Sequence, residues 1–75
     1  MAERIWEQED AEIKTMTVDE VYRALQSMGV KTTPLKIRAA ISQGVYPFGI
    51  CINMENREFE IYETLFEKWV SERVS

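Results

Sequence analysis

The sequence predicts a small α+β fold in which two linked helices, a β-hairpin and a closing helix share one core. Three observations support this fold class. Two short stretches with helical apolar spacing each follow a capping residue, and they end at Gly29 and Gly44. Between Ile50 and Ile61, apolar and polar residues alternate as they do in β-strands. Residues 63–73 return to helical spacing, which predicts a third helix.

Length and composition limit both the size of the domain and its chemistry. A chain of 75 residues makes one small domain and buries only about 60% of its unfolded surface. Cys51 is the sole cysteine and there is no histidine, so neither an intrachain disulfide nor the usual Cys/His zinc site is expected. The longest apolar runs are only a few residues. We therefore expect a cytoplasmic location and no membrane partner.

The N-terminal segment differs in composition from the rest of the chain. Residues 1–12 are acidic, with Ile5 and Trp6 as their only large apolar side chains, and we interpret them as a tail. The sequence leaves open whether Trp6 docks on the domain or on a partner. The folded domain is expected to span residues 13–75. Within it, residues 13–17 alternate apolar and polar side chains, which predicts a short edge strand.

The first helix is predicted from both of its ends. Thr17 and Glu20 form an S/T-x-x-E capping box, in which each side chain accepts a hydrogen bond from a backbone N–H of the other residue. Gly29 provides the left-handed stop, and Val30 suits the hydrophobic contact that accompanies it. The residues between them carry one apolar stripe: Val18, Val21, Tyr22, Leu25 and Met28.

A second helix follows after a linker of about five residues. Thr33 is the expected N-cap, and Pro34 occupies the first helical position, where a missing N–H is harmless. Gly44 ends the helix. Its buried stripe consists of Ile37, Ala40 and Ile41. Two short helices joined this closely have the layout of a helix-turn-helix.

Residues 45–49 contain proline and glycine and predict a turn. We expect the turn's aromatic residues, Tyr46 and Phe48, to pack on the core. A hairpin is predicted next, with Glu55-Asn56 as a two-residue turn in which Asn56 tolerates the positive φ that such a turn needs.

This turn fixes the expected register of the hairpin, because each residue of one strand then has a defined partner on the other. The predicted pairs are Ile52 with Phe59 and Ile50 with Ile61, on the face toward the core. The other face pairs Cys51 with Glu60 and Asn53 with Glu58.

The closing helix is predicted over residues 63–73 and is expected to pack on the sheet. Phe66 and Trp69 lie on its apolar face and are interpreted as core residues. The other residues at that spacing are Leu65, Val70 and Arg73 or Val74. A helix-turn-helix followed by a two-stranded hairpin is a winged-helix arrangement, in which the hairpin adds apolar area to a thin core.

Charge is unevenly distributed along the chain. The formal net charge is −4, yet the 34 residues from Val21 to Met54 contain no Asp or Glu. This stretch carries four bases: Arg23, Lys31, Lys36 and Arg38. An acid-free stretch in an acidic protein favours one electropositive face, as contact with phosphates requires.

The whole order of elements resembles the excisionase-type winged helix, a group within the MerR-like DNA-binding domains of phages and mobile elements. The resemblance rests on three stretches and covers residues 13–73: TVDEVYRALQSMGVKTTPLKIRAAISQGVYPFG, the hairpin ICINMENREFEIY and the helix ETLFEKWV. The matching features are the capping box, a second helix that ends at a glycine, a proline-bearing turn, a short wing and an aromatic closing helix.

The resemblance implies a sequence-specific protein that binds double-stranded DNA without a cofactor or a small-molecule substrate. In that family the second helix enters the major groove, and the wing touches the backbone or the minor groove. It implies cooperative or dimeric self-association, or an integrase, as further partners. The expected DNA-binding residues on or near the second helix are Thr32, Thr33, Lys36, Arg38, Ala39, Ser42 and Gln43. The wing tip would add Asn53, Asn56 and Arg57.

Two departures from the family pattern leave an alternative open. Relatives commonly carry bases where this chain has Ala39 and Ser42, and acidic Glu55, Glu58 and Glu60 in the wing would be repelled by phosphates. The alternative function is a protein-interaction or phage-assembly adaptor that uses the same fold to bind a basic partner. No nucleophile with an activating base and no glycine-rich phosphate loop is recognisable. We therefore expect a protein that is not an enzyme.

Overall fold

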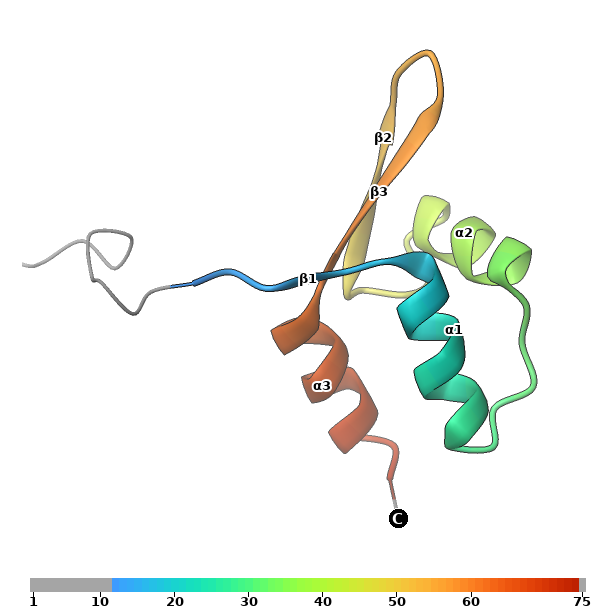
Figure 1. Cartoon of the computed structure of the whole chain (residues 1–75), viewed down its shortest axis with the longest axis vertical. Helices are drawn as coiled ribbons and strands as arrows, with labels where there is room; N and C mark the ends of the chain where they lie inside the picture. Colours follow the sequence, from blue (N-terminus) through green and yellow to red (C-terminus); the bar gives the residue numbers. More distant parts are fainter. Residues whose placement is uncertain (1–11, 75) are drawn as a thin grey trace, which may run out of the picture.

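The computed structural model describes residues 12–74. The predictions for Ile5, Trp6 and most of the acidic tail fall outside the described residues. Over residues 12–74 the chain forms a small α+β domain with three helices and one three-stranded antiparallel sheet (Figure 1). The longest of these helices has ten residues, so none of them is long enough to cross a membrane.

The sheet has the strand order β1-β3-β2. Its strands are β1 (Thr15–Met16), β2 (Gly49–Asn53) and β3 (Arg57–Tyr62). The predicted N-terminal edge strand is confirmed, although it is only two residues long. Met16 pairs with Ile61, and the N–H of Glu63 donates to the carbonyl oxygen of Lys14 at 3.0 Å. The start of the domain is thereby tied to its central strand.

Helix α1 (Val18–Ser27) begins and ends as its sequence predicts. The Thr17 hydroxyl accepts from Glu20 N at 3.1 Å, and Glu20 Oε1 accepts from Thr17 N at 3.0 Å. At the other end Gly29 has φ +86°, and Val30 N donates to Leu25 O at 2.9 Å. This is the Schellman arrangement, which satisfies the last carbonyls and turns the chain toward the second helix.

Helix α2 (Pro34–Ser42) uses the same two devices. The Thr33 hydroxyl accepts from Lys36 N at 3.2 Å. Gly44 has φ +74°, and Val45 N donates to Ala40 O at 2.8 Å. Pro34 occupies the first turn as predicted. Both caps are local features of the sequence, so both ends of α2 could be predicted to within a residue or two.

The core lies where α1, α2, the sheet and α3 (Glu63–Ser71) meet. Its buried side chains are Val21, Leu25, Ile37, Ile41, Phe48, Ile61 and Phe66. The ring of Phe48 lies between 5.1 and 5.2 Å, centroid to centroid, from those of Tyr46, Phe66 and Trp69. The expected packing of the turn aromatics and of the closing helix is therefore confirmed. Pro47, between Tyr46 and Phe48, is exposed.

The predicted register of the hairpin is wrong by one residue. Cys51 pairs with Phe59 and Ile52 pairs with Glu58, so three residues (54–56) connect the strands instead of two. A tight two-residue turn of the expected kind needs residues with positive φ. No described residue other than glycine has one, Asn56 included. The longer loop removes that requirement.

The corrected register exchanges the two faces of β2. Ile50 and Ile52, expected to face the core, are 48% and 38% exposed, while Cys51 lies on the core side and is half-buried. Phe48, just before the strand, is fully buried and occupies the core at the base of the hairpin. Farther out the hairpin extends past the helices (Figure 1), so burial does not select between its faces.

Candidate functional site

The outward face of α2 is the first component of the candidate site. Ile37 and Ile41 are buried against the core, and the rest of the helix turns to solvent because of its 3.6-residue period. Leu35 is 75% exposed at the start of this face. The other exposed residues of α2 and its C-cap include five of the expected DNA-binding residues: Lys36, Arg38, Ala39, Ser42 and Gln43. The backbone N–H of Lys36 donates to the Thr33 hydroxyl in the cap, and its side chain is exposed.

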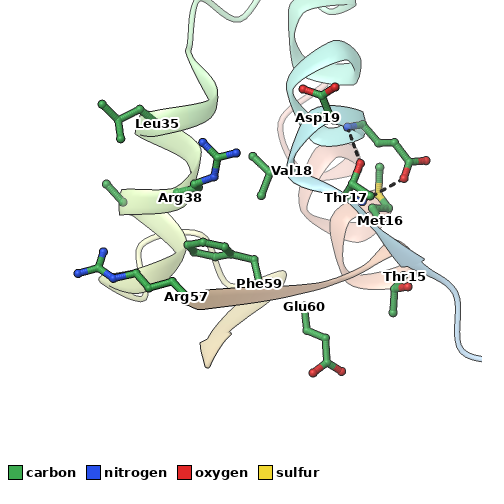
Figure 2. A pocket seen from close by; sticks show the side chains of 12 residues that line it. Thr15, Met16, Thr17, Val18, Asp19, Leu35, Arg38, Arg57, Phe59 and Glu60 are labelled. Atoms are coloured by element: carbon green, nitrogen blue, oxygen red, sulfur yellow. Dashed lines mark hydrogen bonds between the residues drawn. The ribbon is translucent and has the colours of Figure 1, made fainter. Parts of the chain in front are cut away.

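The corrected hairpin register supplies the second component. Side chains on a strand alternate between its two faces, so Arg57 lies on the same face of β3 as Phe59 and Ile61, toward α2. Glu58 and Glu60 lie on the opposite face, where they pair with Ile52 and Ile50. Figure 2 shows Phe59 and Glu60 on opposite sides of the strand. Glu58 and Glu60, two of the wing acids expected to repel phosphates, therefore point away from α2, while Glu55 lies in the loop.

Arg38 and Arg57 line a single open hollow of about 870 Å³. It is bounded by α2, by β3, and by the segment that leads from β1 into α1 (Figure 2). Arg38 enters it from α2, near Val18, while the guanidinium of Arg57 points away from that of Arg38. The remaining residues that line it are Thr15, Met16, Thr17, Asp19, Glu20, Leu35, Ala39, Phe59 and Glu60.

The three carboxylates around this hollow are engaged within the chain. Asp19 lies 3.5 Å from Arg23 on the same helix, and Glu20 is committed to the capping box. Glu60 Oε1 accepts from the Tyr62 hydroxyl at 3.0 Å. This hydrogen bond, more than partial desolvation and the negative charge of Glu60, raises the pKa of Tyr62 above its ordinary value of 10.0.

The two arginines of the hollow, by contrast, lack an ionic partner in the described part of the chain. The ion pairs of residues 12–74 are Arg23 with Asp19 and Arg73 with Glu72. Arg38 and Arg57 are exposed and take part in neither. An unpaired guanidinium carries five N–H donors suited to oxyanions. The hollow thus holds two guanidiniums without an ion-pair partner among residues 12–74, beside Asp19, Glu20 and Glu60, of which only Asp19 is paired with a cation.

Lys36 is not brought together with Arg38. It lines a different hollow of about 620 Å³ with Thr32, Thr33 and the α1–α2 linker. Helical spacing places Lys36 and Arg38 on opposite flanks of the exposed face of α2, with Ala39 and Ser42 between them. Both bases were expected among the DNA-binding residues of the second helix, and the structure places them beside two different hollows.

Four further expected residues do not line the hollow of Arg38 and Arg57: Thr32 and Thr33 before α2, and Asn53 and Asn56 in the wing. The hydroxyl oxygen of Thr33 accepts the N-cap hydrogen bond from Lys36 N, and its hydroxyl proton can still be donated. Thr32 Oγ1 is buried and has no hydrogen-bond partner among residues 12–74, so it does not reach an outside phosphate in this conformation. Asn53 and Asn56 are exposed at the end of the hairpin. The structure therefore brings Arg38, Ala39 and Arg57 together beside one hollow. Asn53 is the strand partner of Arg57 but does not line the hollow, and Asn56 lies in the loop.

Two residues of the hollow were not singled out from the sequence. Leu35 lies outside the buried stripe of α2, so its position in the helical repeat could have predicted an exposed apolar residue. Phe59 was assigned to the core, and it is half-buried at the hollow's floor between Arg57 and the helices.

Comparison with protein-family models, with curated proteins and with solved structures found no match to this chain. Within residues 12–74, no group of three or more His, Cys, Asp or Glu side chains is arranged to hold a metal ion. The site must therefore be interpreted from its own geometry and charges.

Proposed function

We propose that this chain is a small sequence-specific double-stranded DNA-binding protein of the winged helix-turn-helix kind. It places α2 in the major groove and uses the β2–β3 hairpin as a wing, and it works as an excisionase-like architectural factor or a transcriptional regulator. It has no catalytic activity and needs no cofactor. Its action is to occupy or bend a DNA site.

The observation that carries this proposal is the shared hollow of Arg38 and Arg57. One guanidinium comes from α2 and the other from the hairpin, and the carboxylates beside them already have partners within the chain. Two elements that would straddle a DNA backbone each contribute a cation that has no ion-pair partner among residues 12–74. Phosphate contacts of this kind fix the position and orientation of a protein on a duplex.

The arrangement of α2 is also consistent with insertion into the major groove. A helix in that groove is bordered by a phosphate backbone on each side, and α2 carries Arg38 on one flank and Lys36 on the other. Between them the small side chains of Ala39 and Ser42 allow the helix to approach the base edges. Alanine suits the methyl group of thymine, and serine can donate to or accept from either base type.

The absence of bases at Ala39 and Ser42 then has a consequence for affinity. Only about three to five phosphates can be neutralised by this face, so the salt-dependent part of binding is modest. A single copy is expected to bind weakly, and binding of several copies at adjacent sites, or an integrase beside it, would offset that weakness.

The proposal is tested with a fluorescent duplex of mixed sequence, by measuring anisotropy against protein concentration at low and at moderate salt. Binding at micromolar protein that weakens as salt rises supports it. The logarithmic slope should correspond to about three to five displaced counterions. Absence of any salt-sensitive binding would contradict it and would favour the adaptor alternative.

A further inference from the structure

The outer face of the hairpin differs in character from the face that carries Arg57. It presents Ile50 and Ile52 from β2 beside Glu60 and Glu58 from β3. The two isoleucines are substantially exposed. Glu60 also lines the hollow, but its carboxylate is held by the Tyr62 hydroxyl and extends from the side of β3 opposite Phe59 (Figure 2). The face is therefore a mixed apolar and acidic patch, separate from the proposed DNA contact.

The free edge of β2 lies alongside this patch. β2 is at the end of the strand order, and no described strand pairs with its outer side. Tyr62 N donates to Phe48 O at 3.0 Å, and hydrogen-bonded and non-bonded pairs alternate along an antiparallel ladder. The N–H and C=O groups of Gly49, Cys51 and Asn53 consequently point outward.

This edge lacks the usual protection against pairing. Natural edge strands are commonly blocked by a charged side chain, an internal proline or a bulge. The sequence of β2, GICIN, has no charge and no proline, and it pairs with β3 without a bulge. An edge of this kind is suited to accept an additional strand.

We propose that β2 and the outer face of the hairpin bind an extended segment of another protein, in which apolar residues alternate with lysine or arginine. The segment pairs with the edge of β2 through its backbone. Its lysine or arginine side chains cover Ile50 and Ile52 with their aliphatic stems. The charged ends of the same side chains reach Glu58 and Glu60. Two strand spacings, about 10 Å, separate the added strand from β3, and a long basic side chain and a glutamate span that distance together.

A second copy of this chain fits the surface less well. If β2 paired with β2 of another copy, the added strand would again be GICIN, which brings no cation to Glu58 and Glu60. Charge complementarity therefore selects a basic partner. Such a partner would be held on one side of the hairpin while DNA is held on the other.

The experiment uses a short blocked peptide of alternating lysine and valine as the probe, without DNA. Binding is followed by NMR on the full chain, from the backbone amide signals and from their rates of hydrogen exchange. The expected result is slower exchange at the amides of Cys51 and Asn53 on addition of the peptide. A lysine–valine peptide methylated at every backbone nitrogen has no N–H to donate on either edge and cannot form the ladder, so it should leave those amides unchanged.

The charge part of the proposal is tested with the double variant Glu58→Gln, Glu60→Gln. It should weaken peptide binding about fivefold, as expected for two exposed ion pairs. Glutamine at position 60 still offers an oxygen to Tyr62, so the fold is retained. The matched control is Glu55→Gln with Glu67→Gln, which removes two exposed acids elsewhere and should leave the affinity unchanged.

Three results would overturn the proposal. One is no binding of the lysine–valine peptide at any soluble concentration, and another is binding that leaves the amides of β2 unprotected. The third is protection of those amides by self-association of the protein alone. None of these results depends on whether the protein binds DNA, so this inference and the proposed function can fail separately.

Discussion

Arg57 and Glu58 are consecutive in the chain, yet their side chains lie on opposite faces of the β2–β3 hairpin. The alternation of a strand sends Arg57 toward α2 and the hollow it shares with Arg38, and sends Glu58 to the outer face with Glu60. A hairpin that appears acidic in sequence can therefore present a cation to one partner and carboxylates to another. The two faces are the basis of both proposals.

We predict that Ala39→Arg increases affinity for DNA. Ala39 is exposed at the centre of the outward face of α2 and lines the hollow of Arg38. An added guanidinium there adds a positive charge that can reach a guanine edge or extend to a flanking phosphate, and we expect affinity at moderate salt to rise about three- to tenfold. Duplex anisotropy measures the change. The control is Ser71→Arg, which adds the same charge on α3, and an equal gain there would show that only net charge matters.

The pH prediction concerns Tyr62, whose pKa is raised chiefly by its hydrogen bond to Glu60. In the unfolded chain the phenol titrates first, near 10.0. Its contribution to stability is therefore fully present below that pH and is lost as the pH rises through the higher folded pKa. The absorbance of tyrosinate should show a late-titrating tyrosine in the native protein. Glu60→Ala, which removes the acceptor, should move it back toward the ordinary value, and an unmoved titration would exclude Glu60 as the cause.

We predict that Gly49→Ala destabilises the domain. A Cβ at this position would lie 3.0 Å from the carbonyl oxygen of Glu60 and 3.0 Å from Cγ1 of Ile61, so β2 and β3 would have to move apart. Such overpacking costs about 1–3 kcal/mol. Urea unfolding measures it. A midpoint equal to that of the native chain would mean that the close approach of the strands at Gly49 is not needed.

Thr17→Ala should lower the free energy of unfolding by about 1 kcal/mol, because it removes the side-chain half of the capping box of α1. Thr17→Ser keeps the hydroxyl and should retain most of the stability. If serine costs as much as alanine, the contribution of Thr17 comes from its methyl group and the cap is not what stabilises the helix.

The helices could be predicted from the sequence because their signals are local. Thr17 with Glu20, Thr33 with Pro34, and the two glycines with positive φ each specify a helix end within a few residues. The register of the hairpin could not be predicted in the same way. An apolar pattern specifies register only where one face of a strand is buried. Neither face of the hairpin is buried beyond the helices, so the positions of Ile50 and Ile52 favoured the wrong pairing.

Arg38, Ala39 and Arg57 of the candidate site could be named from the sequence, but Leu35, Phe59 and the grouping of these residues could not. Arg38 and Arg57 are 19 positions apart, and only the pairing of β3 with β2 places them beside one hollow. Lys36 and Arg38, two positions apart, were both expected among the DNA-binding residues and lie on opposite flanks of α2. Long-range strand pairing and helix rotation decide both outcomes, and neither can be deduced from charge along the chain.

The central claim, that Arg38 and Arg57 bind one nucleic acid from two elements, is tested most directly by the salt dependence of DNA binding in variants. Arg38→Gln and Arg57→Gln should each lower the slope of log K against log salt by about 1, and the double variant by about 2. Lys68→Gln, which removes an exposed cation on α3, should leave the slope unchanged. A slope unchanged by either arginine, or reduced equally by Lys68→Gln, would contradict the account.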